Sequence, residues 1–446
     1  DSFAAGFSDN ALFIEGQKNS YPAILASQFA LVGGGEFTIP LMNDNVGGLL
    51  LGGTMIQGPR LYFNGSGPAP VSEMPTTEIT NVQAGPFNNM GIPGSKSFHL
   101  LAPGYGNVAG VPSGQANPYF VRFASSPSTT VLADATAQSP TFFSLWIGNN
   151  DVLSYATSGG SGTNQLGNYD PSSYGGNDIT DPTVFANVYA TLIDGLTANG
   201  AKGVVANIPY VTTIPYFTTV PHNPVPLDAA TAGLLNSGFT QYNNGLLLAQ
   251  SYNLITADEV ARRKISFSAS ANNKVVMVDS YLTNLSALGL PSYRQATAED
   301  LVVLPARTFI GTVVGGNPTQ INGVSVPLAD NWILSKDEIA ELKTATDAFN
   351  AAIQSIASSK NLAFVDANML MGQIANGGIS KDNFTLTSNY VTGGAFSLDG
   401  VHPSPRGYAL IAHEFFKAIN STYGSNFKGV NIGKYRILYP ENSDNF

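Results

Sequence analysis

The chain has 446 residues, enough for a large buried core, and by length alone it could hold two or three domains. Only 11% of the residues are charged and the net charge is −10 at pH 7, which excludes the basic face that nucleic acid or an anionic membrane requires. The chain has no cysteine and no apolar run of about 18 residues, so disulfides and thiolate metal sites are excluded and no transmembrane helix is expected.

The first clear regular elements are a strand, a helix and a second strand. The apolar run 142–147 predicts a strand that ends just before a segment rich in glycine and asparagine. A helix should begin at Pro182, because Asp181 is a good N-cap residue and proline is favoured at the first helical position. Apolar residues then recur at helical spacing, and Gly200 suits the end of that helix. The short apolar run 203–208 is typical of a buried parallel strand.

The same order of helix and strand recurs in the last quarter of the chain. Ser335 and Glu338 have the spacing of a capping box, and an apolar stripe follows them. The run 362–365 predicts the next strand, and 408–419 predicts an apolar C-terminal helix. Strands that alternate with helices indicate an α/β fold, in which a parallel sheet is covered by helices on both faces.

Three stretches between these elements are interpreted as long loop insertions on a single domain spanning residues 1–446. Residues near 33–85 are punctuated by glycine and proline, and 154–180 are rich in glycine, serine, asparagine and tyrosine. Residues near 254–332 contain one strand candidate, 274–279, among short segments. No repeat of fixed period is visible.

Four short segments carry residues suited to hydrolytic chemistry. In chain order they are Asp1-Ser2-Phe3-Ala4-Ala5-Gly6-Phe7, Asn89-Met90-Gly91-Ile92-Pro93-Gly94, Ile147-Gly148-Asn149-Asn150-Asp151 and Asp399-Gly400-Val401-His402. Their residue types and order resemble the four sequence blocks of the GDSL/SGNH family of serine esterases and lipases. The resemblance extends from residue 1 to residue 402, and it implies a three-layer α/β/α fold with a central, flavodoxin-like parallel sheet. The chain also resembles the large secreted or lipoprotein members from Gram-negative bacteria.

The resemblance implies a catalytic triad of Ser2, Asp399 and His402, with Gly94 and Asn150 donating hydrogen bonds to the oxyanion. These residue types suit the chemistry. A serine hydroxyl becomes a good nucleophile only when a positioned base such as histidine takes its proton, and an aspartate can orient that histidine. The oxyanion needs preorganised donors. A glycine lets a backbone N–H approach closely, and an asparagine at the end of a strand offers a neutral amide.

Some competing residues stay open and others are set aside. Ser8 is a second serine near the N-terminus, although its flanking residues fit the first block less well. Asn149 competes with Asn150, because adjacent side chains point in different directions. His413 lacks the second histidine of the zinc-protease pattern and lies on the predicted C-terminal helix, so a structural role is expected. The chain has no G-x-S-x-G motif, which argues against an α/β-hydrolase.

These observations predict a carboxyl-ester hydrolase that acts through an acyl-enzyme intermediate and needs no metal or cofactor. Its substrate could be a lipid ester, a short acyl ester or an acetylated sugar. Because fold does not fix function, a second interpretation stays open. In that interpretation the chain is a weakly active or inactive surface lipoprotein, and it serves as a binding or assembly subunit for a partner protein at the cell surface. The low charge favours an extracytoplasmic location, and the resemblance implies the cell surface or outer membrane.

The first block also carries an expectation about the sheet. In the family this block follows a central apolar strand and a glycine, whereas this sequence opens at Asp1. A doubly wound sheet flanks its first strand on both sides, and the loss of that strand would leave unpaired backbone groups in the core. We therefore expect a strand and a glycine to precede Asp1 in the mature protein, with an export signal, such as a lipoprotein signal, further upstream.

Overall fold

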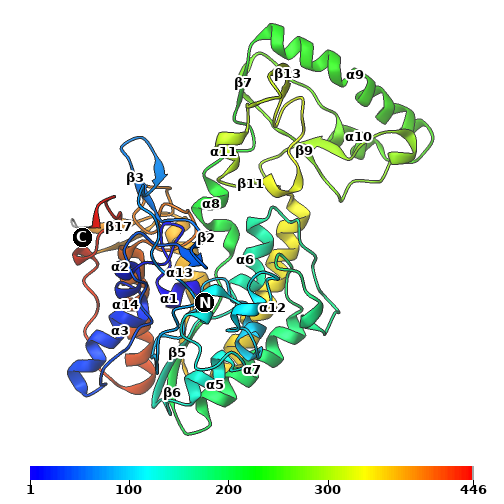
Figure 1. Ribbon diagram of the computed structural model, residues 1–446. Helices are drawn as coiled ribbons and strands as arrows, with labels where there is room; N and C mark the ends of the chain where they lie inside the picture. Colours follow the sequence, from blue (N-terminus) through cyan, green and yellow to red (C-terminus); the bar gives the residue numbers. More distant parts are fainter. Residues whose placement is uncertain (444–446) are drawn as a thin grey trace.

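A small parallel sheet lies at the centre of the computed structural model, which describes residues 1–443 (Figure 1). Its order is β15–β6–β5, with β5 at Phe142–Leu145, β6 at Lys202–Ala206 and β15 at Ala363–Val365. The middle strand pairs in parallel with both neighbours: Val204 lies opposite Ser144 on one side and Ala363 on the other. The three central strands predicted from the sequence are confirmed, each slightly shorter than its apolar run.

Helices pack on either side of these strands. Figure 1 shows α3 (Tyr21–Phe29) and α14 (Pro405–Tyr423) on one side of β5 and β6, and α5 (Val131–Thr136), α7 (Pro182–Thr197) and α12 (Lys336–Ser359) on the other. The predicted helix starts are confirmed. The Asp181 side chain accepts the N–H groups of Thr183 and Val184, and Ser335 and Glu338 form a reciprocal capping box. The chain is therefore an α/β protein with a parallel sheet.

The carboxyl ends of the three strands meet at one edge and are tied together there. The side-chain amide of Asn207, after β6, donates to Asp366, after β15, over 2.9 Å. The indole N–H of Trp146, after β5, donates to the backbone carbonyl of Asn207 over 3.0 Å. This edge is where open α/β sheets hold their ligands.

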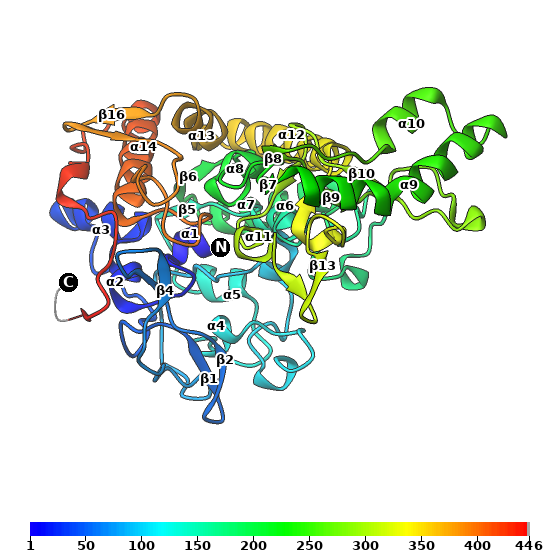
Figure 2. The ribbon, with the colours of Figure 1, turned by 90° about the horizontal axis from the view of Figure 1, so that it is seen from above.

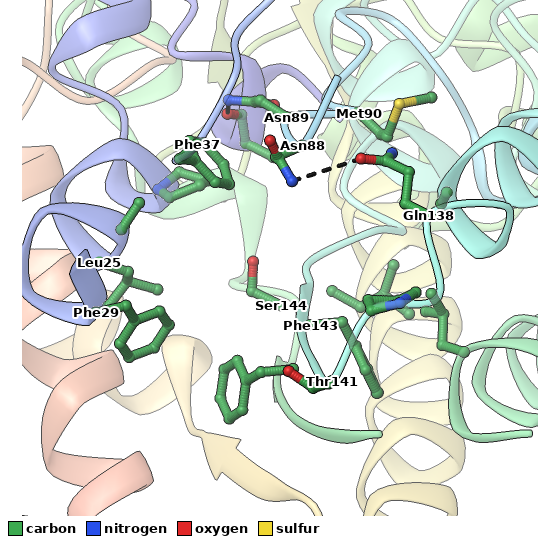
Figure 3. Close-up of a pocket in the computed structure, with 18 of the residues that line it drawn as sticks. Leu25, Phe29, Phe37, Asn88, Asn89, Met90, Gln138, Thr141, Phe143 and Ser144 are labelled. Atoms are coloured by element: carbon green, nitrogen blue, oxygen red, sulfur yellow. Dashed lines mark hydrogen bonds between the residues drawn. The ribbon is translucent and has the colours of Figure 1, made fainter. Parts of the chain in front are cut away.

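The long side of β5 that faces away from β6 borders a groove of about 650 Å³ (Figure 3). Within residues 1–443, β5 pairs only with β6. Leu25 and Phe29 of α3 form one wall of the groove, and Asn88 lies across from Ser144 of β5. Asp1 also lines the groove.

The chain between β6 and α12 forms a lobe that projects away from the sheet in both views (Figures 1 and 2). Its longest element, α9 (Ala229–Ser251), was not predicted, and the strand expected at 274–279 is β9 (Val276–Val278), which pairs with β10 in antiparallel orientation. The lobe contains α8 (Pro215–Thr218), β7 (Val225–Leu227), α9, α10 (Ala257–Arg263), β8 (Ser270–Asn273), β9, β10 (Tyr293–Gln295), β11 (Leu301–Val302), α11 (Ala306–Phe309), β12 (Val313–Val314), β13 (Asn317–Ile321) and β14 (Ile333–Leu334).

Short elements fill the rest of the molecule. The glycine-rich stretch near 33–85 contains two hairpins, and 154–180 begins inside a helix and continues as loop. That these stretches and 254–332 are insertions on one domain remains a prediction. No helix within residues 1–443 is both long enough and apolar enough to cross a membrane. The short elements are α1 (Ser2–Ala5), α2 (Ile14–Lys18), β1 (Leu49–Leu51), β2 (Thr54–Gln57), β3 (Leu61–Phe63), β4 (Pro68–Pro70), α4 (Pro118–Val121), α6 (Asn150–Thr157), α13 (Ala367–Ala375), β16 (Ile379–Lys381) and β17 (Phe384–Leu386).

Candidate active site

Ser2 is the first residue of α1, a single helical turn whose two ends are fixed. Asp1 caps the helix, because its carboxylate accepts the N–H of Phe3 over 3.0 Å. Gly6 ends it with a φ of 84°, in the left-handed region, and a Cβ at Gly6 would lie 2.4 Å from the carbonyl oxygen of Gly16. Only glycine fits this turn, which holds α1 against the following helix.

The structure brings the three predicted triad residues together. His402 Nε2 lies 3.0 Å from the Ser2 hydroxyl oxygen, although the two residues are 400 positions apart in the chain. His402 Nδ1 lies 2.9 Å from Oδ2 of Asp399. The other oxygen of Asp399, Oδ1, accepts the backbone N–H groups of Val401 and His402, each over 2.8 Å. All of these lengths are within the range expected of a nucleophile, a base and an orienting acid.

The charge on Asp399 fixes the direction of these hydrogen bonds. Burial alone would raise the pKa of the Asp399 carboxyl, but the interactions with His402 and with the two backbone N–H groups outweigh it and hold the pKa below its usual value. The carboxylate therefore stays ionised and can only accept hydrogen bonds. His402 Nδ1 must then carry the proton that is donated to Asp399, which leaves Nε2 free to accept the Ser2 O–H.

Two aromatic rings hold the imidazole of His402 in place. The Phe7 ring centroid lies 4.6 Å from that of His402, and the Phe3 ring meets it edge-on at 5.7 Å. Phe3 in turn packs edge-on against Trp146 at the end of β5, with ring centroids 5.0 Å apart. Residues of the first block therefore position the histidine as well as the serine.

The two asparagines after β5 have different partners. The side-chain amide of Asn150 donates to the carbonyl of Ser95, the residue after Gly94, over 2.9 Å. The amide of Asn149 donates to Oδ2 of Asp1, the residue before Ser2, also over 2.9 Å. Each amide has two hydrogens, so each keeps one for another acceptor. The structure thus joins Asn150 to the Gly94 loop and Asn149 to the serine helix, and the role of Asn150 remains a prediction.

The second block packs directly on the serine helix through a glycine that sequence reasoning did not single out. A Cβ at Gly91 would lie only 2.3 Å from the backbone nitrogen of Ala5, so a larger residue would displace α1. The neighbouring Asn89 amide donates to the carbonyl of Ala4 over 2.9 Å. Gly91 is the first of the two glycines in the block, but the sequence alone does not show which segment packs against a loop glycine.

The competing residues also have definite places. The Ser8 hydroxyl donates to the carbonyl of Pro403 over 3.1 Å, so it serves the loop after the histidine, whereas Ser2 contacts His402 itself. His413 accepts the backbone N–H of Val430 over 3.2 Å, in keeping with the structural role expected of it.

Comparison with known families agrees with this geometry. The model of the family GDSL-like Lipase/Acylhydrolase matches residues 1–415, and the chain therefore belongs to this family. Membership supports a hydrolase of ester bonds as the general class of function. No curated protein and no solved structure matches the chain.

Proposed function

We propose that this protein is a serine carboxyl-ester hydrolase with Ser2 as nucleophile, His402 as general base and Asp399 as the residue that orients the base. The continuous chain of hydrogen bonds from Ser2 through His402 to the ionised Asp399 carries the proposal. Ser2 Oγ attacks the acyl carbon of the ester while its proton passes to His402 Nε2. The resulting oxyanion accepts hydrogen bonds from the backbone N–H groups of Ser2 and Gly94 and from the Asn150 amide.

In the steps that follow, His402 acts as a general acid and then again as a general base. His402 Nε2 returns its proton to the leaving alcohol oxygen as the C–O bond breaks, and the acyl group remains on Ser2 Oγ. A water molecule then loses a proton to Nε2 and attacks the acyl carbon. When the second tetrahedral intermediate collapses, the acid leaves and Ser2 recovers its proton. The protein supplies each proton transfer from its own side chains, so the proposed mechanism needs no metal or cofactor.

A small apolar cavity supports an ester with a short acyl group as the substrate. The cavity has a volume of about 60 Å³ and is lined by Phe3 and Val401, which adjoin two of the triad residues, and by Asn149. About 10–15 Å³ of space measured in this way holds one water, so the cavity has room for only a few waters, which favours a short acyl group over a long lipid chain. We expect hydrolysis of 4-nitrophenyl acetate to exceed that of 4-nitrophenyl palmitate.

Three broader features are also proposed. The helices on both sides of β5 and β6 support a three-layer α/β/α arrangement of the flavodoxin type. The low charge supports an extracytoplasmic location, and the resemblance to large secreted or lipoprotein members supports the bacterial cell surface. Such a location would bring the protein close to other surface proteins, one of which could be a partner.

A fluorophosphonate probe, which reacts with activated serines, tests the proposed function. The wild-type protein should be labelled, and Ser2→Ala should lose the labelling and about a million-fold of its turnover. Ser113→Ala, at an exposed serine, is the matched control and should retain both. Labelling that persists in Ser2→Ala but disappears in Ser8→Ala would move the nucleophile to Ser8. A wild-type protein without labelling or esterase activity would favour a binding or assembly subunit.

A further inference from the structure

A tight turn at Asp9 and Asn10, outside the four sequence blocks, has an unusual backbone. Both residues lie in the left-handed region, with φ of 51° and 66°. The flanking residues close the turn, because Ser8 and Ala11 exchange backbone hydrogen bonds of 3.1 and 3.0 Å. Asparagine and aspartate tolerate positive φ better than other residues with a side chain, yet two in succession remain uncommon. Such a conformation persists only where the surroundings hold it, and it often marks a functional position.

The turn contacts the loop that carries Asp399 and His402, both before Asp399 and after His402. The N–H of Asn10 donates over 2.9 Å to Oδ2 of Asp399, the same oxygen that His402 Nδ1 contacts. Asp9 makes two contacts just before it: its Oδ1 accepts the N–H of Leu398 over 2.8 Å, and its own N–H donates to the Ser397 hydroxyl over 2.9 Å. Beyond the histidine, the Ser8 hydroxyl donates to the carbonyl of Pro403.

These contacts fix the plane of the Asp399 carboxylate. Oδ1 accepts two N–H groups from its own loop, and Oδ2 is shared between Asn10 N–H and His402 Nδ1–H. With both oxygens engaged, the carboxylate can rotate only by breaking hydrogen bonds. The orientation of this carboxylate sets the orientation of the His402 imidazole, so that Nε2 faces the Ser2 hydroxyl. The contact from Asn10 is made by the backbone N–H, and that N–H reaches Asp399 only while the turn keeps its left-handed conformation.

We propose that the Asp9–Asn10 turn is a positioning element that holds Asp399 in the orientation required to align His402 with Ser2. The inference rests on the proposed function, because it assigns the turn a role in that reaction. The turn acts through Asp399, which the N–H of Asn10 contacts. Its conformation, and not the Asn10 side chain, supplies the contact.

This distinction gives a sharp experiment with 4-nitrophenyl acetate. Asn10→Val places a β-branched residue at positive φ, which should shift the turn and lower kcat by about 100-fold, the order expected for a misplacement of about 1 Å, with KM little changed. Asn10→Gly lacks the side chain but adopts positive φ readily, so it should keep wild-type kcat. A low-field proton NMR signal from His402 Nδ1–H should be present in the wild type and in Asn10→Gly and be lost or shifted in Asn10→Val.

The chain offers a matched control for general destabilisation. Asp382 and Asn383, at the turn between β16 and β17, are the same residue pair with nearly the same φ of 52° and 68°. Asn383→Val should therefore lower Tm without lowering kcat. Wild-type kcat in Asn10→Val, or an equal loss of kcat in Asn10→Gly or Asn383→Val, would overturn the proposal.

Two further measurements separate the possible failures. If Asn10→Val does not fold, Ser397→Ala removes the hydroxyl that holds the Asp9 N–H and should lower kcat at constant KM, whereas unchanged kcat would overturn the proposal. If the wild-type protein shows no esterase activity, the proposed function fails, and the NMR signal of His402 Nδ1–H still shows whether the turn positions Asp399.

Discussion

Asn149 and Asn150 follow the same strand, and the contacts of each predict a different loss on substitution. Asn150 reaches the Gly94 loop, so Asn150→Ala should lower kcat by about 10²- to 10³-fold through the loss of an oxyanion donor. Asn149 holds the Asp1 carboxylate that caps α1, so Asn149→Ala should mainly lower Tm. Steady-state kinetics and thermal melting of both variants check the assignment. The reverse pattern would make Asn149 the oxyanion donor.

The raised pKa values of two buried carboxyl groups predict how the stability of the protein changes with pH. Burial, the largest cause in both, raises the pKa of Asp9 and of Glu338 to about 7; Asp399 adds to the rise for Asp9, and Asp330 adds to it for Glu338. Between pH 4 and pH 7 the folded state then holds protons that the unfolded state has released. Their contribution to stability is therefore present below about pH 4 and is lost as the pH rises to about 7, by up to roughly 1.4 kcal/mol per pH unit for each group.

Variants isolate this effect from other groups. His99, whose pKa burial and Lys96 lower to about 4, acts in the opposite direction, because its contribution is lost as the pH falls below about 6.5. The test is consequently the difference in Tm between each variant and the wild type, measured as a function of pH. Asp9→Asn and Glu338→Gln should each gain Tm relative to the wild type as the pH rises from 5 to 7.5. A Tm difference that does not vary with pH would contradict the raised pKa values.

At the scale of elements, the sequence predicted those helices and strands whose signals are local. Asp181 with Pro182, and Ser335 with Glu338, mark helix starts by side-chain chemistry that survives in the structure. The long helix α9 was missed, because none of its residues is charged and it contains three glycines, at positions 233, 238 and 245. Packing of Leu235 and Leu246 in the lobe stabilises it instead. The two- and three-residue strands of the lobe are too short to show alternation.

A buried arginine joins several segments of the lobe. Arg294 of β10 donates to Asp279 over 2.6 Å and to both oxygens of Asp300 over 2.7 Å, and all three side chains are buried. Asp300 also accepts the N–H of Lys336 at the start of α12. Removing one partner of a buried ion pair leaves an unpaired charge, so Arg294→Met should destabilise the lobe by about 3–5 kcal/mol.

Limited proteolysis with mass spectrometry checks this prediction. Cleavage in Arg294→Met should appear first within the lobe, and the surface variant Arg262→Met should be cleaved like the wild type. Cleavage that begins in the elements around β5 would show that the arginine supports the whole molecule.

At the scale of the whole molecule, the candidate site was more predictable than the fold around it. The four blocks name residues whose chemistry is recognisable without coordinates, and the structure brings His402 within hydrogen-bond reach of both Ser2 and Asp399. What could not be predicted is the support for these residues. The N–H of Asn10, the close packing of Gly91 and the rings beside His402 all depend on contacts between distant segments. Such contacts leave no local pattern.

The separation of Ser2 from His402 also predicts the order of events during refolding. Closing a loop of 400 residues has an entropic cost that must be met before the contact forms, and contacts distant in sequence form slowly. We expect the far-UV circular dichroism to recover first and reactivity toward a fluorophosphonate to recover later. Simultaneous recovery of the two signals would show that the ends meet early.

The same separation has a consequence for synthesis on the ribosome. Ser2 emerges before His402, which is translated only after the sheet, the lobe and α12 have been made. In the proposed mechanism, Ser2 of a nascent chain therefore cannot react until the segment that carries His402 has left the exit tunnel. If translation stops before residue 402, the proposed mechanism leaves Ser2 without a base, so we expect such fragments to be inert toward esters.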